Sequence, residues 1–306
     1  MQSLRLPRIS HGFWLFAALF VAAEIERARY QSPLFPLMEA ALLGTLCWCT
    51  ARITQRTDET PRRGRFFALQ LFAAVFVIVT IGISGAIFNK IIPASAGMPL
   101  WEPSASAFSI FLTRHLPTTL TEFGITNGIR NFIFDLVPLG IVLFACGLGL
   151  RDMGLGRFRP GSLKVALIWL TIPIVAFIAI VATHQRPLSF VALLWLSNLL
   201  QNGLTEELLF RGMILGRLRN LLGNDWGLVT QALLFGMWHY GLDLSTFHGN
   251  ILLAASSMIT SQALFGYAWG FVALRTGNVL IGSACHLLSD SISEIPNLAN
   301  SFVSLF

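Results

Sequence analysis

The chain has 306 residues, of which 55% are hydrophobic and 12% are charged, and its mean hydropathy is +0.68. This composition excludes an ordinary soluble domain and predicts an all-α protein that crosses a membrane many times. The formal net charge of +6 does not indicate a nucleic-acid partner, because the Lys and Arg residues fall in short connections between apolar runs.

Nine apolar segments are candidate transmembrane helices, each of which needs about 20 residues to cross a hydrocarbon core of about 30 Å. They cover residues 12–23, 34–51, 66–89, 128–150, 165–183, 187–222, 226–242, 250–274 and 279–292. The first segment also resembles a secretory leader, with Arg5 and Arg8 before the apolar run. Glu24 and Glu26 occupy the place of a cleavage site, which favours a helix. We therefore expect eight or nine transmembrane helices.

The basic residues predict the orientation of these helices. One short connection contains Arg52, Arg56, Arg62, Arg63 and Arg65, and another contains Arg151, Arg157, Arg159 and Lys164. Positive charge accumulates in cytoplasmic connections, so both are expected inside and residues 90–127 outside. With nine spans the N-terminus lies inside and the C-terminus outside. We expect a multi-pass integral protein in the cell membrane of a prokaryote.

Ionisable residues divide the chain into three parts. Residues 1–186 have few such groups in their apolar runs, and their role is unassigned. Residues 187–292 contain many, which marks this part as the working core with a polar cavity within the membrane, since intramembrane charge is costly and functional by default. Residues 293–306 are expected to form a short tail. The four cysteines form no CxxC pair and are expected to be small buried hydrophobes.

Three polar pairs in residues 187–292 have the spacing of one helical turn. They are Glu207 with Arg211, Phe235 with His239, and His286 with Asp290. Residues four apart share a helix face, so three helices can present polar groups to a common centre. Glu207 and Arg211 can neutralise each other, which leaves Glu206 without a partner.

An unpartnered carboxylate beside imidazoles has the ingredients of a general base for water. Glu206 is the expected base, and His239 is expected to help bind the water. His286 and Asp290 are expected to hold the substrate carbonyl and its oxyanion. Asp290 is a poor donor unless it is protonated, and its alternative role is to fix the tautomer of His286. Phe235 is expected to form a wall of the site.

These motifs resemble those of a known protease family. The sequence Glu206-Glu207-Leu-Leu-Phe-Arg211, then Phe235-Gly-Met-Trp-His239, then His286-Leu-Leu-Ser-Asp290 is similar to the CAAX prenyl endopeptidase and bacteriocin-processing (CPBP or Abi) intramembrane proteases. The resemblance covers residues 187–292. It implies hydrolysis of a membrane-associated or lipidated peptide, with Glu206 as base, His239 activating water and His286 in the oxyanion site. The family commonly has Asn at the position of Asp290, which puts the fourth role in doubt.

Other functions remain open from the residues alone. Two histidines and a glutamate are a plausible zinc set, although the HExxH pattern is absent and the resemblance favours a metal-free reaction without a cofactor. A transporter or proton relay could use the same carboxylates and histidines. A third alternative is an inactive family member that acts as a binding or immunity protein.

The length of one segment predicts an interruption. Residues 187–222 would form a helix of about 52 Å, well beyond a core of about 30 Å. In an unbroken helix Glu206 would lie near the inner surface and His239 about 20 Å deeper. A bend or re-entrant turn is therefore expected at residues 201–203, just before Leu204.

Overall fold

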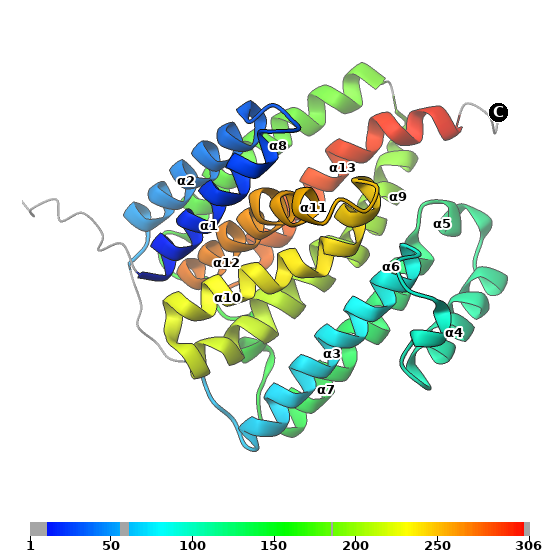
Figure 1. Cartoon of the computed structure of the whole chain (residues 1–306), viewed down its shortest axis with the longest axis horizontal. Coiled ribbons are helices and arrows are strands. Elements are labelled where there is room, and N and C mark those ends of the chain that lie inside the picture. The colour runs from blue at the N-terminus through cyan, green and yellow to red at the C-terminus, as the bar shows by residue number, and fades with distance from the viewer. Residues whose placement is uncertain (1–10, 56–60, 185, 303–306) are drawn as a thin grey trace, which may run out of the picture.

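The computed structural model describes residues 11–55, 61–184 and 186–302, and this part of the chain is helical, without a named strand. The all-α prediction is confirmed (Figure 1). Arg5, Arg8 and Arg56 lie outside the described residues. The α-helices are α1 (His11–Arg27), α2 (Leu34–Ile53), α3 (Phe67–Phe88), α4 (Trp101–His115), α5 (Thr118–Glu122), α6 (Ile125–Asn131), α7 (Val137–Ala145), α8 (Ser162–His184), α9 (Leu188–Asn198), α10 (Leu215–Thr246), α11 (Ile251–Met258), α12 (Leu264–Thr276) and α13 (Leu280–Phe302). Wider π-helical turns are η2 (Phe132–Leu136), η4 (Leu199–Gly203), η5 (Glu207–Ile214) and η6 (Ile259–Ala263), and tighter 3-10 turns are η1 (Ala94–Ala96) and η3 (Leu150–Met153).

Five helical segments are long and apolar enough to cross a membrane. They are Leu34–Ile53, Phe67–Phe88, Ile125–Ala145, Ser162–Thr183 and Ile251–Thr276, and each coincides with an expected span. Large apolar side chains such as Phe72, Val75 and Val79 on α3 face outward. A bilayer rather than water suits such a surface. The other four expected spans also form helices in the described part of the chain, and the protein is a polytopic membrane protein.

The segment before the glutamate pair leaves regular α-helical geometry where an interruption was expected. The helix α9 ends at Asn198, the wider turn η4 covers Leu199–Gly203, and Leu204 is a turn residue. The chain turns again at Gly223, between the expected spans 187–222 and 226–242. The φ of 81° and ψ of 175° at Gly223 are readily adopted only by glycine. Glu206 lies 17 residues before Gly223 and His239 lies 16 residues after it, so two arms of nearly equal length carry the two motifs.

The two basic connections meet at one end of the helices, as their charge predicts. The amide nitrogen of Arg65 donates to the carbonyl oxygen of Cys146 at 2.8 Å, and the side-chain amide of Asn278 donates to Gly156 O at 2.6 Å. We call the end formed by residues 61–66, 146–161 and 275–279 the basic end. The helices α4 and α5, between the third and fourth spans, lie away from it (Figure 1).

The C-terminal helix α13 forms a central part of the bundle. It packs along α8, while α10 packs along α11 and α12. The helix continues to Phe302, and Ile295 within it is completely buried, so the chain just after residue 292 remains part of this helix. All four cysteines are free, and Cys146 and Cys285 are buried as predicted.

Candidate active site

The glutamate pair enters the site at the start of the π-helical turn η5. Glu207 is completely buried, and its Oε1 lies 3.1 Å from Nη1 of Arg211. The ion pair indicated by the four-residue spacing is therefore present. The guanidinium of Arg211 lies 3.9 Å from the ring centroid of Phe235 and 5.5 Å from that of Trp269. These aromatic rings attract the cation and exclude water from the pair.

His286 projects from α13 and contacts both glutamates. Its Nδ1 lies 3.1 Å from Oε1 of Glu207, and its Nε2 lies 3.8 Å from Oε2 of Glu206. Oδ2 of Asp290 lies 3.5 Å from the same Nε2. An ionised carboxylate can only accept, so Nδ1 carries the hydrogen that is donated to Glu207. The contact of His286 Nδ1 with Glu207 is thus shorter than the contact of its Nε2 with Asp290, the residue that the sequence offered for fixing the tautomer.

Two glycines allow the glutamate segment and α13 to approach closely. A Cβ at residue 282, one turn before His286, would lie 2.9 Å from Oε2 of Glu207. A Cβ at residue 203 would lie 3.0 Å from the carbonyl oxygen of Ser283. Glycine at both positions is therefore required for the short contacts of His286 with the two carboxylates.

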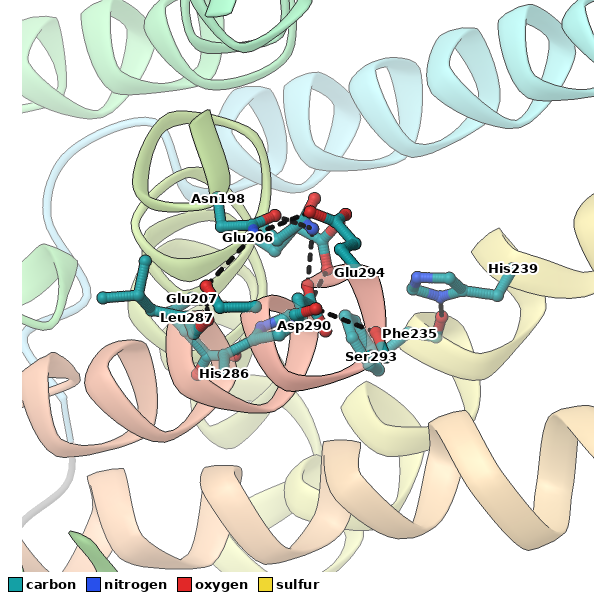
Figure 2. Close-up of polar contacts among 12 residues, drawn as sticks. Asn198, Glu206, Glu207, Phe235, His239, His286, Leu287, Asp290, Ser293 and Glu294 are labelled. Carbon is teal, nitrogen blue, oxygen red and sulfur yellow. Dashed lines mark hydrogen bonds and ion pairs between the residues drawn. The ribbon is translucent and has the colours of Figure 1, made fainter. Parts of the chain in front are cut away.

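A chain of polar side chains extends the site along α13 (Figure 2). The side-chain amide of Asn202 donates to Oδ2 of Asp290 at 2.5 Å. One turn earlier, the amide of Asn198 donates to Oε2 of Glu294 at 2.9 Å and to Oγ of Ser291 at 3.2 Å. Sequence reasoning missed both asparagines. The signal available was their position four residues apart in an apolar run, on the face that Glu206 continues.

His239 lies to one side of this cluster. Its Nδ1 donates to the carbonyl oxygen of Phe235 at 3.0 Å, so its Nε2 carries a lone pair. The Phe235 ring separates the two imidazoles, with ring centroids 4.8 Å from His239 and 6.1 Å from His286. In the described part of the chain no direct polar contact joins His239 to Glu206. Figure 2 shows the ring of His239 beside Phe235, apart from the carboxylates.

The two glutamates are in different electrostatic states. Oε1 of Glu207 has a guanidinium and an imidazole at 3.1 Å each, whereas the nearest cationic group that the described residues offer to Glu206 is the imidazole of His286, 3.8 Å from Oε2. Oε2 of each glutamate is buried without a hydrogen-bond partner among the described residues. Glu206 is itself 6% exposed. A buried carboxylate oxygen without a donor is costly, and such exceptions mark chemistry or a bound molecule. Of these two carboxylates, Glu207 is the one in a guanidinium ion pair, and Glu206 is the one without such a contact in the described part of the chain.

The zinc alternative requires a cluster of suitable ligands. Zinc in catalytic sites is commonly held by three protein ligands with nitrogen, sulfur or oxygen donors. Among the residues that the structure describes, no three or more His, Cys, Asp or Glu side chains are arranged to hold a metal ion.

Comparison with known proteins places this region in a class. Residues 187–292 match the sequence model of the Rce1-like family, described as type II CAAX prenyl endopeptidase Rce1-like. The resemblance drawn from the three motifs is thereby confirmed for this region. A human protein, CAAX prenyl protease 2, is 34% identical to the chain over 98 residues. That match covers 30% of this chain and 30% of the human protein. No solved structure matches the chain.

Proposed function

We propose that the protein is an intramembrane endopeptidase in which Glu206 activates water to hydrolyse a peptide bond of a membrane-associated or lipidated peptide. The observation that carries this proposal is the unequal pair: Arg211 forms its ion pair with Glu207, while Glu206 is buried beside His286 without a guanidinium contact among the described residues. The carboxylates of Glu206, Glu207 and Asp290 all contact the imidazole of His286. Such a local cluster suits an active site better than a proton relay, which needs polar groups spread across the membrane.

The proposed reaction begins with a water bound between Glu206 and the scissile carbonyl. Glu206 accepts a proton as the water oxygen bonds to the carbonyl carbon, and a tetrahedral oxyanion forms. His286 is proposed to act as an imidazolium beside the three carboxylates of Glu206, Glu207 and Asp290, so that Nδ1–H is donated to Glu207 while Nε2–H stabilises the oxyanion. Glu206 then returns the proton to the amide nitrogen as the C–N bond breaks. In this proposal Glu206 transfers the proton, and Glu207 positions the imidazole of His286.

Asn202 and Asp290 are proposed to act as one unit. The amide that related proteases commonly have at the position of Asp290 is replaced here by a carboxylate, and Asn202 brings an amide to the same place. The Asn202 amide satisfies Asp290 and limits its repulsion of Glu206. Asn202 and Asp290 are thereby proposed to share the role that the resemblance assigns to the position of Asp290.

His239 is proposed to hold the far side of the bound water or substrate. Its Nδ1–H is occupied by the carbonyl of Phe235, so Nε2 can accept a hydrogen bond. Because Phe235 lies between His239 and His286, a molecule that spans both imidazoles must pass over this ring. Phe235 then forms the wall that the sequence predicts, and the substrate completes the connection between His239 and the carboxylates.

The substrate class follows from the comparisons as a proposal. The matching family and the human relative are both described by activity on CAAX prenyl proteins. A lipidated C-terminal peptide would reach a site among membrane helices by partitioning its lipid into the bilayer. We therefore propose prenylated peptides as the first substrates to test, with other membrane peptides as the alternative.

The test uses purified protein in nanodiscs with matched prenylated and unprenylated peptides, and products are mapped by mass spectrometry. The proposal expects one internal cleavage by the wild type and none by Glu206→Gln. Glu24→Gln removes another buried carboxylate, on α1, and is expected to cleave like the wild type. Equal cleavage by Glu206→Gln and the wild type would exclude the glutamate mechanism. Cleavage of unprenylated peptides alone would retain the mechanism and reject the proposed substrate.

A further inference from the structure

A cavity of about 690 Å³ opens at the basic end, beside the last residues of η5 and the first turns of α10. It lies between the connection 61–66, the connection 146–161, the start of α10 and residues 277–279. This volume lies in the range of about 300–1,000 Å³ that is usual for small-molecule sites. The cavity therefore has room for a small organic anion.

Arginine dominates the lining of this cavity. The guanidinium-bearing residues are Arg62, Arg151, Arg157, Arg159, Arg211 and Arg219. Asp152 is the one acidic residue among the described lining residues, and its Oδ2 already accepts from the backbone nitrogen of Gly149 at 2.9 Å. Like charges gathered around one cavity repel each other, and an anion between them removes that cost.

Arg211 borders the cavity, but its guanidinium belongs to the active site. Its side chain has no exposed surface, Nη1 faces Glu207, and the guanidinium lies 3.9 Å from the ring centroid of Phe235. The positive charge that faces the cavity itself therefore comes from the arginines of the connections, above all Arg62 and Arg157, which are exposed.

We propose that this cavity binds a phosphate-bearing anion. Guanidinium forks match phosphate oxygens in pairs, and a phosphate offers more acceptors and charge than a carboxylate to a ring of arginines. The basic end is also where the headgroups of anionic phospholipids would lie if it faces the cytoplasmic leaflet. The phosphate could therefore come from a lipid headgroup or from a soluble phosphate compound.

Two arms of one experiment distinguish these sources, and neither depends on peptide cleavage or on the proposed function. In the first, retention of phosphatidylglycerol is measured by native mass spectrometry, and thermal unfolding is compared in nanodiscs with and without this lipid. In the second, inorganic phosphate is added to phosphatidylcholine nanodiscs against sodium chloride of equal ionic strength. Stabilisation in the first arm indicates a headgroup, and stabilisation in the second indicates a soluble phosphate.

Arginine variants test the location of the site. Arg62 and Arg157 are exposed at the rim, and neither side chain makes a hydrogen bond or ion pair in the described part of the chain. The double variant Arg62→Gln/Arg157→Gln is expected to bind roughly tenfold more weakly, from the loss of two charge-assisted contacts. The matched control is Arg63→Gln/Lys164→Gln, which removes the same charge from residues that do not line the cavity.

Folding of each variant is checked by its unfolding temperature in phosphatidylcholine alone, and Arg157→Gln replaces the double variant if that protein fails to fold. Retention by the control together with loss in the cavity variant supports the site. Equal loss in both variants would show unspecific attraction to the basic end and overturn the proposal. Absence of stabilisation in both arms would overturn it as well.

Discussion

The replacement Glu207→Gln removes one charge from the centre of the site and keeps the size of the side chain. Glu207 is completely buried and contacts Arg211 and His286 at 3.1 Å each, so the variant leaves a buried guanidinium without its counterion. Removing one partner of a buried ion pair costs about 3–5 kcal/mol. Glu206→Gln is expected to be neutral or to stabilise by about 1 kcal/mol, because it relieves an unpartnered buried carboxylate.

The assay is the free energy of unfolding in a fixed mixed micelle, measured for both single variants and for Glu207→Gln/Arg211→Met. Removing both charges of a buried pair is often close to neutral, so the double variant is expected to recover about 2 kcal/mol or more relative to Glu207→Gln. Cleavage is expected to fail in all three. The reasoning is refuted if Glu207→Gln is as stable as Glu206→Gln, or if the second replacement adds further destabilisation.

Three other replacements or treatments test the account. Gly212→Ala places a Cβ 2.1 Å from the carbonyl oxygen of Met153 and is expected to destabilise the protein by about 1–3 kcal/mol. The control Gly216→Ala, whose nearest contact lies at 3.6 Å, is expected to change the stability little. Similar unfolding temperatures for the two variants would contradict this expectation. Asn202→Asp is expected to lower kcat at least about tenfold, because it places two carboxylates together, whereas Asp290→Asn is expected to retain most of the activity. Equal kcat values for the two variants would reject the proposal that Asn202 and Asp290 act together. Chelation with 1,10-phenanthroline is expected to leave the rate unchanged, and loss that added zinc restores would establish a metal.

Local spacing predicted the contacts within a helix turn. Glu207 and Arg211 are four residues apart, and the geometry of a helix alone brings them together. The convergence of Glu206 with His286 was also predicted, first from the helical spacing of the three polar pairs and then from the resemblance between motifs. The four-residue separation of His286 and Asp290 correctly placed both on one side of α13.

Features that depend on tertiary packing could not be predicted. The contact of Asn202 with Asp290 joins residues 88 positions apart, and no local pattern marks an amide as its partner. A connection after residue 222 was expected from the division between spans 187–222 and 226–242, but the backbone angles of Gly223 follow only from the structure. The wider turn η4 lies at the expected break, because a helix can absorb an extra residue per turn without ending.

The most direct measurement is the single-turnover cleavage rate of Glu206→Gln relative to the wild type, with both proteins in the same nanodiscs at equal folded fraction. General acid–base catalysis contributes about 10²- to 10⁴-fold, and the account predicts a loss of that size with unfolding stability preserved. A folded Glu206→Gln protein that cleaves within about twofold of the wild-type rate would contradict the assignment of Glu206 as the base.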